Sequence, residues 1–269
     1  MRWVIGDIHG MFRPLQVLLT AVTSFDRNAH FIFAGDYINR GPQSREVIAL
    51  LLTLPSAQFV RGNHDDVFDF IVNGASYCDY PFATRQEAVA AYLECGLDQT
   101  FASYGVGPAE IDRAIGSSQP DAVEGLAKAI PQGHRNFFRV LDPVVEYDDV
   151  FIAHAMWRCD EPDRMALSPG LEERARRDDA LRHRLLWGRF REAEIRCRKP
   201  WQRTGYFGHT PVLKLRGSRG IGNVPLRGPR IVLVDTGAAL GPQGRLSAVC
   251  IEDGSFLQAD PDGKIVGSE

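Results

Sequence analysis

Seven side chains that could hold metal ions stand in five short motifs, each directly after an apolar run. The motifs are GDIHG (6–10), GDYINRG (35–41), GNHD (62–65), AHA (153–155) and GHT (208–210). Their carboxylate, imidazole and amide groups, with no thiolate among them, suit manganese, iron, zinc or nickel rather than calcium. The set is large enough for two metal ions if one carboxylate bridges them: Asp7, His9, Asp36, Asn63, His64, His154 and His209.

The chain around the first three motifs alternates between strand-like and helix-like patterns. Strands are predicted by RWVI, HFIFAG and AQFVRG, and helices by RPLQVLLTAVTSF and PQSREVIALLLTL, with Pro42 suited to a first helical turn. This βαβαβ order is typical of a sheet with crossover helices, whose sites form outside the carboxyl ends of the strands. Asp7 and His9 lie two residues apart, so an extended chain would point both side chains to the same face. We therefore expect the motifs to meet at one edge of the sheet.

The rest of the chain predicts further helices and strands, without an internal repeat or a linker. Residues 66 to about 140 have mostly helical patterns, clearest in RQEAVAAYLE and DAVEGLAKAI. Strands are expected at DVFIAH, TGYFGH, RIVLVDTG and LSAVCIED, and an arginine-rich helical segment at 171–198. The final ADPDGKIVGSE has the composition of a turn and a tail. We expect one domain over residues 1–269, with mostly helical segments at about 66–140 and 156–200.

Composition places the chain among ordinary globular proteins, since 44% of its 269 residues are hydrophobic and 24% are charged. No apolar run approaches the ~18 residues of a membrane span, and MRWVIGD is too poor in apolar residues for a signal peptide. These features predict a cytoplasmic protein that does not enter a membrane. The five cysteines are an odd number, widely spread and without a CxxC pair, which argues against both a disulfide framework and a zinc–thiolate site.

The net charge of −3 is unevenly distributed along the chain. Residues 1–150 hold 11 Lys/Arg and 19 Asp/Glu, whereas residues 151–269 hold 20 and 15. Metal-binding carboxylates account for part of the acidic excess. The basic excess, densest in 174–199 and 214–230, either steers an anionic substrate or forms a solvated helix face.

The five motifs together resemble the pattern of the phosphoprotein phosphatase family of metallophosphoesterases, which is GDxHG, GDxVDRG, GNHE/D, a later HA or HG, and GHT. Other segments extend the likeness. LLWGRF (185–190), GHTPVLKL and VLVDTGAALGPQGRLSAVCIE are similar to parts of the bacteriophage lambda phosphatase group, although the loop DTGAALG lacks the tyrosine of eukaryotic members. FASYGV and LAKAIPQGHRNFFRVL resemble the middle of bacterial serine/threonine phosphatases of this type. The resemblance covers roughly residues 2–257.

This resemblance implies an α/β (α+β) fold, the four-layer αββα metallophosphoesterase sandwich in which two mixed β-sheets are flanked by helices. By position in the family motifs, Asp7, His9 and Asp36 would hold one divalent metal ion, with Asp36 as the bridge to a second. Asn63, His154 and His209 would hold that second ion. Manganese is the first choice for both, with iron, zinc or nickel as alternatives. A water molecule bridging them would become hydroxide and attack phosphorus in line.

Four more roles follow from the same resemblance. Arg40 and Arg189 would grip the phosphate, because a planar guanidinium donates paired hydrogen bonds and stays charged. His64 would protonate the leaving group, and with Asn63 it would also contact the substrate. The residue matching Asn39 is usually Asp in this family, where it pairs with the histidine and raises its pKa. Asn39 can orient the ring but supplies no charge, and Asp65, directly after His64, is not expected to replace it.

Asn39, whether native or engineered, leaves three functions open. The leading hypothesis is a phosphatase with a weakened acid, acting on phosphoserine or phosphothreonine proteins or on small phosphoesters. The second is a bis(5'-nucleosyl)-tetraphosphatase, because bacterial diadenosine tetraphosphatases also lack Asp at this position and also carry GNHD. The third is an impaired phosphatase that acts as a binding module. We expect neither nucleic acid nor membrane as a partner, leave the oligomeric state open, and expect TRQEAVAAYLE and 171–198 to shape substrate choice.

Overall fold

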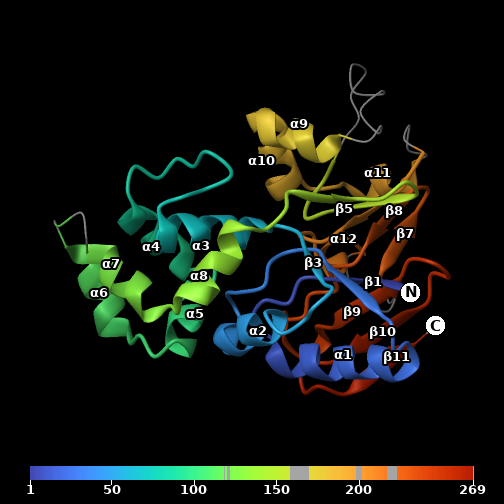
Figure 1. Cartoon of the computed structure of the whole chain (residues 1–269), viewed down its shortest axis with the longest axis horizontal. Helices are drawn as coiled ribbons and strands as arrows, with labels where there is room; N and C mark the ends of the chain where they lie inside the picture. Colours follow the sequence, from blue (N-terminus) through green and yellow to red (C-terminus); the bar gives the residue numbers. More distant parts are fainter. Residues whose placement is uncertain (118, 120–121, 158–169, 198–201, 217–222, 269) are drawn as a thin grey trace.

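Two mixed β-sheets lie face to face at the centre of the computed structural model, which describes residues 1–117, 119, 122–157, 170–197, 202–216 and 223–268 (Figure 1). Helices cover the outer faces of the sheets, and a lobe of further helices extends to one side. The four layers confirm the predicted αββα sandwich.

The first sheet has the strand order β11-β10-β9-β1-β2-β3. Its parallel part consists of β1 (Arg2–Ile5), β2 (His30–Phe33) and β3 (Gln58–Phe59). Helices α1 (Phe12–Phe25) and α2 (Ser44–Leu51) connect these strands, which confirms the predicted βαβαβ unit. Helix α2 begins at Ser44, so Pro42 precedes it rather than standing in its first turn.

The antiparallel part of this sheet comes from the end of the chain, where the predicted turn is present but the predicted tail is wrong, because residues 265–268 form a strand. It consists of β9 (Leu246–Cys250), β10 (Phe256–Ala259) and β11 (Ile265–Ser268). The turn between the last two strands is closed by Gly263 N–H donating to Asp260 O at 2.9 Å. Strand β11 is short and lies at the sheet edge, so too few of its residues alternate in polarity to reveal it.

The second sheet has the order β4-β5-β6-β8-β7. The predicted strands are β5 (Val150–Ala153), β6 (Thr204–Phe207) and β8 (Ile231–Leu233), which are parallel neighbours. The sequence patterns did not predict β4 (Val144–Glu146) and β7 (Leu226–Gly228), which add antiparallel edges.

Alternating side chains let each strand support two apolar layers. Val4 and Ile32 of the first sheet and Ile152 of the second are fully buried in the layer between the sheets. Trp3 and Ile5 point the other way, into the core beneath α1 and the helical lobe. Because successive strand residues face opposite sides, this packing holds the carboxyl ends of β1, β2 and β5 in place.

The region predicted to be helical at 66–140 forms the lobe at the left of Figure 1. Its helices are α3 (Asn63–Asn73), α4 (Arg85–Leu93), α5 (Leu97–Ser103), α6 (Pro108–Gly116), α7 (Ala122–Ala129) and α8 (Gln132–Arg139). Over the second sheet lie α9 (Leu171–Arg177), α10 (Asp179–Trp187), α11 (Glu192–Arg196) and α12 (Val212–Arg216), and a 3₁₀ turn occupies Gly241–Gln243. The rest of the helical prediction for 156–200 falls partly on 158–169 and 198–200, outside the described residues.

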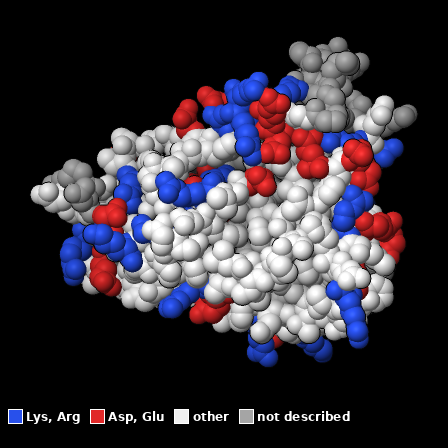
Figure 2. Space-filling view, viewed as in Figure 1, with Lys and Arg blue, Asp and Glu red and all other residues white. Residues whose placement is uncertain are grey.

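The arginine-rich segment presents a mixed surface rather than a basic one. Figure 2 shows Lys and Arg interleaved with Asp and Glu over the region of α9 and α10. On exposed helix faces, Arg177 lies 2.6 Å from Glu173 and Arg196 lies 2.8 Å from Glu192. Pairs of this kind one helical turn apart are typical of a solvated face, so we favour that interpretation for these arginines.

Two further expectations concern thiols and membranes. The four described cysteines are free: Cys78, Cys95, Cys197 and Cys250. Cys159 lies outside the described residues. Among the helices that the structure describes, none has the length and apolarity required to cross a bilayer.

The layer between the sheets is expected to dominate stability. Ile152→Ala should lower the free energy of unfolding by about 2–5 kcal/mol, because it leaves a cavity in the packed layer between the sheets. Urea denaturation followed by circular dichroism measures this change. Val266→Ala is the control, since Val266 is 42% exposed on β11 and its loss should change stability by no more than about 0.5 kcal/mol. Equal effects of the two substitutions would contradict the assignment of this core.

Candidate metal centre

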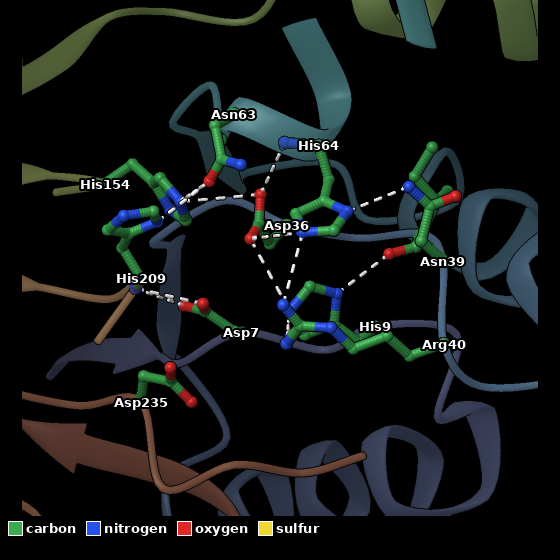
Figure 3. A network of polar contacts seen from close by, with 12 residues as sticks. Asp7, His9, Asp36, Asn39, Arg40, Asn63, His64, His154, His209 and Asp235 are labelled. Atoms are coloured by element: carbon green, nitrogen blue, oxygen red, sulfur yellow. Dashed lines mark hydrogen bonds and ion pairs between the residues drawn. The ribbon is translucent and has the colours of Figure 1, made fainter. Parts of the chain in front are cut away.

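Loops that follow the strands carry the motif side chains into one site (Figure 3). Within the described residues, two groups of ligand atoms each lie within 4.8 Å of one another: His9, Asp36 and His64, and Asp36, His154 and His209. Both groups contain Asp36. Its carboxylate is therefore placed to serve two ions at once.

Asp36 is the centre of this arrangement. Its Oδ1 accepts the backbone N–H of His64 at 3.0 Å and lies 3.4 Å from His154 Nε2. Its Oδ2 lies 3.5 Å from His9 Nε2. Burial alone would raise the pKa of Asp36, but the neighbouring imidazoles of His154 and His64 hold it well below its usual range. Asp36 is thus an ionised carboxylate at neutral pH.

Two imidazoles are fixed with their Nε2 atoms toward Asp36. His9 Nδ1 lies 2.9 Å from Ile38 O, and His154 Nδ1 lies 2.8 Å from Ala34 O. Since a carbonyl only accepts, each Nδ1 donates and leaves the Nε2 lone pair for another partner. Burial lowers the pKa of His9 well below its usual value, so its Nε2 is an unprotonated acceptor at neutral pH. His9 therefore has the tautomer that a metal ligand needs, whereas the Asp36 carboxylate, against the effect of burial, raises the pKa of His154.

The second group contains an unpartnered buried nitrogen. Asn63 Oδ1 lies 2.8 Å from His209 Nδ1 and 3.0 Å from His154 Nε2. His209 Nε2 is buried and has no hydrogen-bond partner among the described residues. Burying such an atom unsatisfied costs about 1–3 kcal/mol, and a metal ion would satisfy it. The donor set around Asn63 therefore fits a bound cation.

A third carboxylate, Asp235, adds to the buried negative charge and was not predicted. Asp7 accepts the backbone N–H of His209 at 2.9 Å, and burial, followed by the charges of Asp235 and Asp36, raises its pKa well above the usual value. Burial raises the pKa of Asp235 to about 6, and within the part of the chain that the structure describes its Oδ2 has no hydrogen-bond partner. Mutual repulsion of buried carboxylates is what a divalent cation relieves. The signal for Asp235 was in the sequence, because it follows the strand RIVLV as the other motif residues follow theirs.

Strained backbone is concentrated in the same loops. Left-handed φ angles occur at His9 (48°), Asp36 (56°), Asn39 (69°), Arg40 (67°) and His209 (64°). A left-handed φ angle costs free energy in a residue other than glycine. It persists only where packing and hydrogen bonds hold the residue in that conformation. The chain is thus turned at His9, not extended as the sequence argument assumed, and the turns aim these side chains.

Asp65 holds two of these loops together. Its carboxylate accepts backbone N–H groups from Asp36 at 2.7 Å, Tyr37 at 3.0 Å and Gly62 at 2.9 Å. These bonds turn it toward the loop backbone. It is therefore a structural residue, and the expectation that it does not replace the carboxylate missing at Asn39 agrees with these contacts.

His64 stands in the first turn of α3 and contacts Asn39. Its Nδ1 lies 2.9 Å from Asn39 Nδ2, and both residues are buried. Burial lowers the pKa of His64 to about 4, despite the attraction of Asp36. The amide oxygen of Asn39 accepts a hydrogen bond from Thr100 at 2.8 Å, a residue that no sequence pattern indicated because it lies on the helical lobe.

Two guanidinium groups flank the ligand groups. Arg40 Nη1 lies 2.6 Å from His9 Nε2, and its Nη2 lies 3.3 Å from His64 Nε2. Arg189 donates from Nη1 to His209 O at 3.2 Å, beside the second group. The predicted residues thus lie around Asp36, with positive charge on either side, but among the described residues Asp7 belongs to neither group of ligand atoms and instead accepts the backbone N–H of His209.

Residues 2–169 of the chain match the calcineurin-like phosphoesterase family. The chain is 25% identical over 283 residues to a symmetrical bis(5'-nucleosyl)-tetraphosphatase of Legionella pneumophila, covering 93% of this chain and 94% of that protein. It is 43% identical over 63 residues to the same kind of enzyme from Coxiella burnetii, covering 23% of this chain and 22% of the relative. Serine/threonine-protein phosphatase 2 of Escherichia coli K12 is also 43% identical over 63 residues, or 23% of this chain and 28% of that protein.

Solved structures share the fold. A crystal structure titled a putative diadenosine tetraphosphatase matches with a TM-score of 0.52 and 20% identity, over 96% of this chain and 92% of the other. A serine/threonine phosphatase from Saccharomyces cerevisiae matches with a TM-score of 0.52 and 17% identity, over 99% and 78% of the two chains. At these identities the likeness supports the fold alone.

Metal binding should be measurable as stability without any assay of activity. An excess of Mn²⁺ near 100 times its Kd is expected to raise the melting temperature by roughly 5–10 °C, because the ion binds only the folded ligand set. Asp36→Asn should remove most of this shift, since it weakens both ligand groups. Asp26→Asn, which changes a partly buried carboxylate that pairs with the N-terminus, should retain it. An undiminished shift in Asp36→Asn would contradict the site.

Proposed function

The chain belongs to the calcineurin-like phosphoesterase family, and on that premise we propose that it is a metal-dependent phosphatase acting on phosphomonoesters. Its substrates would be phosphoserine or phosphothreonine proteins or small phosphoesters. The observation that carries this proposal is the position of Asp36 between two ligand groups, with a guanidinium beside each. A tetrahedral dianion fits such a site because two cationic sides can share its oxygens.

The metal ligands in this proposal are those expected from the family motifs. Asp7, His9 and Asp36 would hold one divalent ion, manganese in the first place. Asn63, His154 and His209 would hold the other, together with Asp36. When bound, the two ions would lower the pKa of a water molecule and neutralise charge on the phosphoryl group.

Arg40 and Arg189 would bind and orient the phosphoryl group from opposite sides. Both side chains reach the site from exposed positions, so they can meet an incoming substrate. Arg40 contacts the ring nitrogens of His9 and His64, at 2.6 Å and 3.3 Å. A phosphoryl oxygen is a stronger acceptor than either ring nitrogen. We expect Arg40 to turn to the substrate when it binds.

His64 would supply a proton or a hydrogen bond from Nε2 to the leaving oxygen. It would also contact the substrate, as would Asn63. Asn39 orients this ring but adds no negative charge, so the imidazolium is not stabilised by a carboxylate at this position. A site of this kind suits leaving groups that depart with little protonation.

Two helical segments reach the site and could select the substrate. The ring of Tyr92, on α4, lies 5.6 Å from that of His64. The ring of Trp187, at the end of α10, lies 6.3 Å from that of His209. These contacts support the proposal that α4 and 171–198 shape substrate choice. Exchange of either segment for that of a relative, with no change in substrate preference, would refute it.

A symmetrical tetraphosphatase is the second candidate. It is favoured by the similarity to the Legionella enzyme along nearly the whole chain and by the absence of a carboxylate at Asn39. Its leaving group, a nucleotide phosphate, is more acidic than a serine hydroxyl and needs less help from His64. No observation favours the third function, an impaired phosphatase acting as a binding module, over these two.

The grip of Arg189 gives the first test of activity. With Mn²⁺ the protein should hydrolyse p-nitrophenyl phosphate, and a chelator should abolish the activity. Arg189→Lys should lower kcat/KM by about 10- to 100-fold, because it removes a paired charged hydrogen bond. Arg191→Lys is the matched control, since Arg191 is exposed and pairs only with its helix neighbour Glu194 among the contacts described.

The same assays separate the two candidates. Rates on a phosphoserine peptide and on diadenosine tetraphosphate are to be compared at equal enzyme and metal. Faster release of nucleoside diphosphate would establish the second candidate. No hydrolysis of any phosphoester with manganese, iron, zinc or nickel would eliminate both.

The amide at Asn39 is expected to limit one step. Asn39→Asp should raise kcat on a phosphoserine peptide by about tenfold, a modest part of what a general acid contributes. It should change kcat on p-nitrophenyl phosphate by less than about twofold, because that leaving group departs with little protonation. Asn28→Asp, an exposed change of the same charge, is the control. An unchanged rate on the phosphoserine peptide would remove Asn39 from the chemistry.

A further inference from the structure

Thr100 reaches from the helical lobe to the amide of Asn39. It stands on α5, is fully buried and lies 61 positions along the chain from Asn39. Its Oγ1 accepts the backbone N–H of Asn39 at 2.9 Å and donates to Asn39 Oδ1 at 2.8 Å. The hydroxyl of Ser44 lies 3.1 Å away. A hydroxyl has one proton and two lone pairs, so these three contacts use all of its hydrogen-bonding capacity.

The contact matters because an amide, unlike a carboxylate, has two different ends. The oxygen of Asn39 faces Thr100, so its nitrogen faces His64 Nδ1 at 2.9 Å. An amide nitrogen only donates, and Nδ1 must then accept. The hydrogen of a neutral His64 ring is thereby placed on Nε2, the atom on the side of Asp36 and Arg40.

The start of α5 also holds the backbone of the loop that carries Asn39 and Arg40. Asn39 and Arg40 both have left-handed φ angles, and Arg40 N–H donates to Gly96 O at 3.2 Å. A Cβ at position 96 would lie 2.4 Å from Arg40 N, so glycine is required there. The approach of Thr100 is thus built into a rigid contact between α5 and the loop.

We propose that Thr100 is a positioning residue, which fixes the orientation of the Asn39 amide and so places a hydrogen on the substrate-facing nitrogen of His64. The expected effect on kcat rests on the proposed phosphatase function, whereas the expected tautomer of His64 does not. Arg40 Nη2 lies 3.3 Å from the same nitrogen, and in this tautomer both atoms are donors, so that contact is not a hydrogen bond. A phosphoryl oxygen could accept from both donors.

Thr100→Val tests the proposal because it keeps the shape of the side chain and removes the hydroxyl. We expect kcat on a phosphoserine peptide to fall about tenfold with KM little changed, and kcat on p-nitrophenyl phosphate to change less than about twofold. Thr100→Ser, which keeps the hydroxyl, should restore the wild-type ratio of the two rates. Thr20→Val is the matched control, since its hydroxyl bonds only to Gln16 O within α1 among the contacts described.

The carboxylate variant sharpens the kinetic test. In Asn39→Asp, both side-chain oxygens can accept a hydrogen bond from His64. In this background, Thr100→Val should therefore lower the logarithm of kcat by less than half as much as it does in the wild type. If Thr100→Val lowers kcat equally in the wild type and in Asn39→Asp, Thr100 acts only on folding or on the backbone of Asn39. Equal losses on both substrates, or a Thr100→Ser variant no better than Thr100→Val, would also overturn the proposal.

A spectroscopic measurement keeps the proposal testable if the protein hydrolyses nothing. Nitrogen-15 NMR of metal-free protein with labelled histidine distinguishes the two neutral ring tautomers, and the His64 signals are assigned by their loss in His64→Gln. We expect the Nε2–H form in the wild type and in Thr100→Ser, and a shift toward the Nδ1–H form in Thr100→Val. A wild-type ring with its hydrogen on Nδ1 would overturn the proposal, whatever the enzyme assays show.

Discussion

At one edge of the sheets the fold buries several carboxylates, and the surrounding structure must compensate for them. Asp7, Asp36 and Asp235 are each at most 2% exposed. Burying a charge costs several kcal/mol unless other groups compensate for it, and here the compensation comes from backbone N–H groups and imidazoles. Space is equally constrained, since a Cβ on Gly208 would lie 2.1 Å from Asp7 Oδ1. The glycine of GHT is thus required by the carboxylate that it packs against.

This constraint explains which parts of the site could be predicted. A residue that both follows a buried strand and belongs to a short motif, such as His154, can be predicted from the local sequence. Asp235 satisfies the first condition, and only the lack of a recognised motif hid it. Thr100 satisfies neither, because its role arises from the packing of α5 against a loop 61 positions earlier in the chain. Long-range hydrogen bonds of this kind leave no periodic pattern in a sequence.

The fold shows the same division. The parallel strands of the first sheet were predicted because apolar runs and crossover helices alternate within 60 residues. The hairpin of β10 and β11 was missed because it is stabilised by the edge of a sheet whose neighbouring strand, β9, pairs with the very start of the chain. Its own residues are few, and β11 lies at the sheet edge with Ile265 and Val266 both exposed. Sheet edges are where pairing, more than side-chain pattern, decides the structure.

The neutral amide at Asn39 is consistent with the charge balance around it. A carboxylate there would need a protonated His64 as its partner, yet burial and the nearby Arg40 favour the neutral ring, whose pKa is lowered to about 4. An amide bonded to a neutral imidazole satisfies both side chains without adding charge to a site that already buries several carboxylates. The cost is chemical, because a neutral ring gives up a proton less readily than an imidazolium. At position 39, a carboxylate would make His64 a more effective acid but would add charge to the buried site. The amide instead stabilises the site without substrate and leaves His64 a less effective acid.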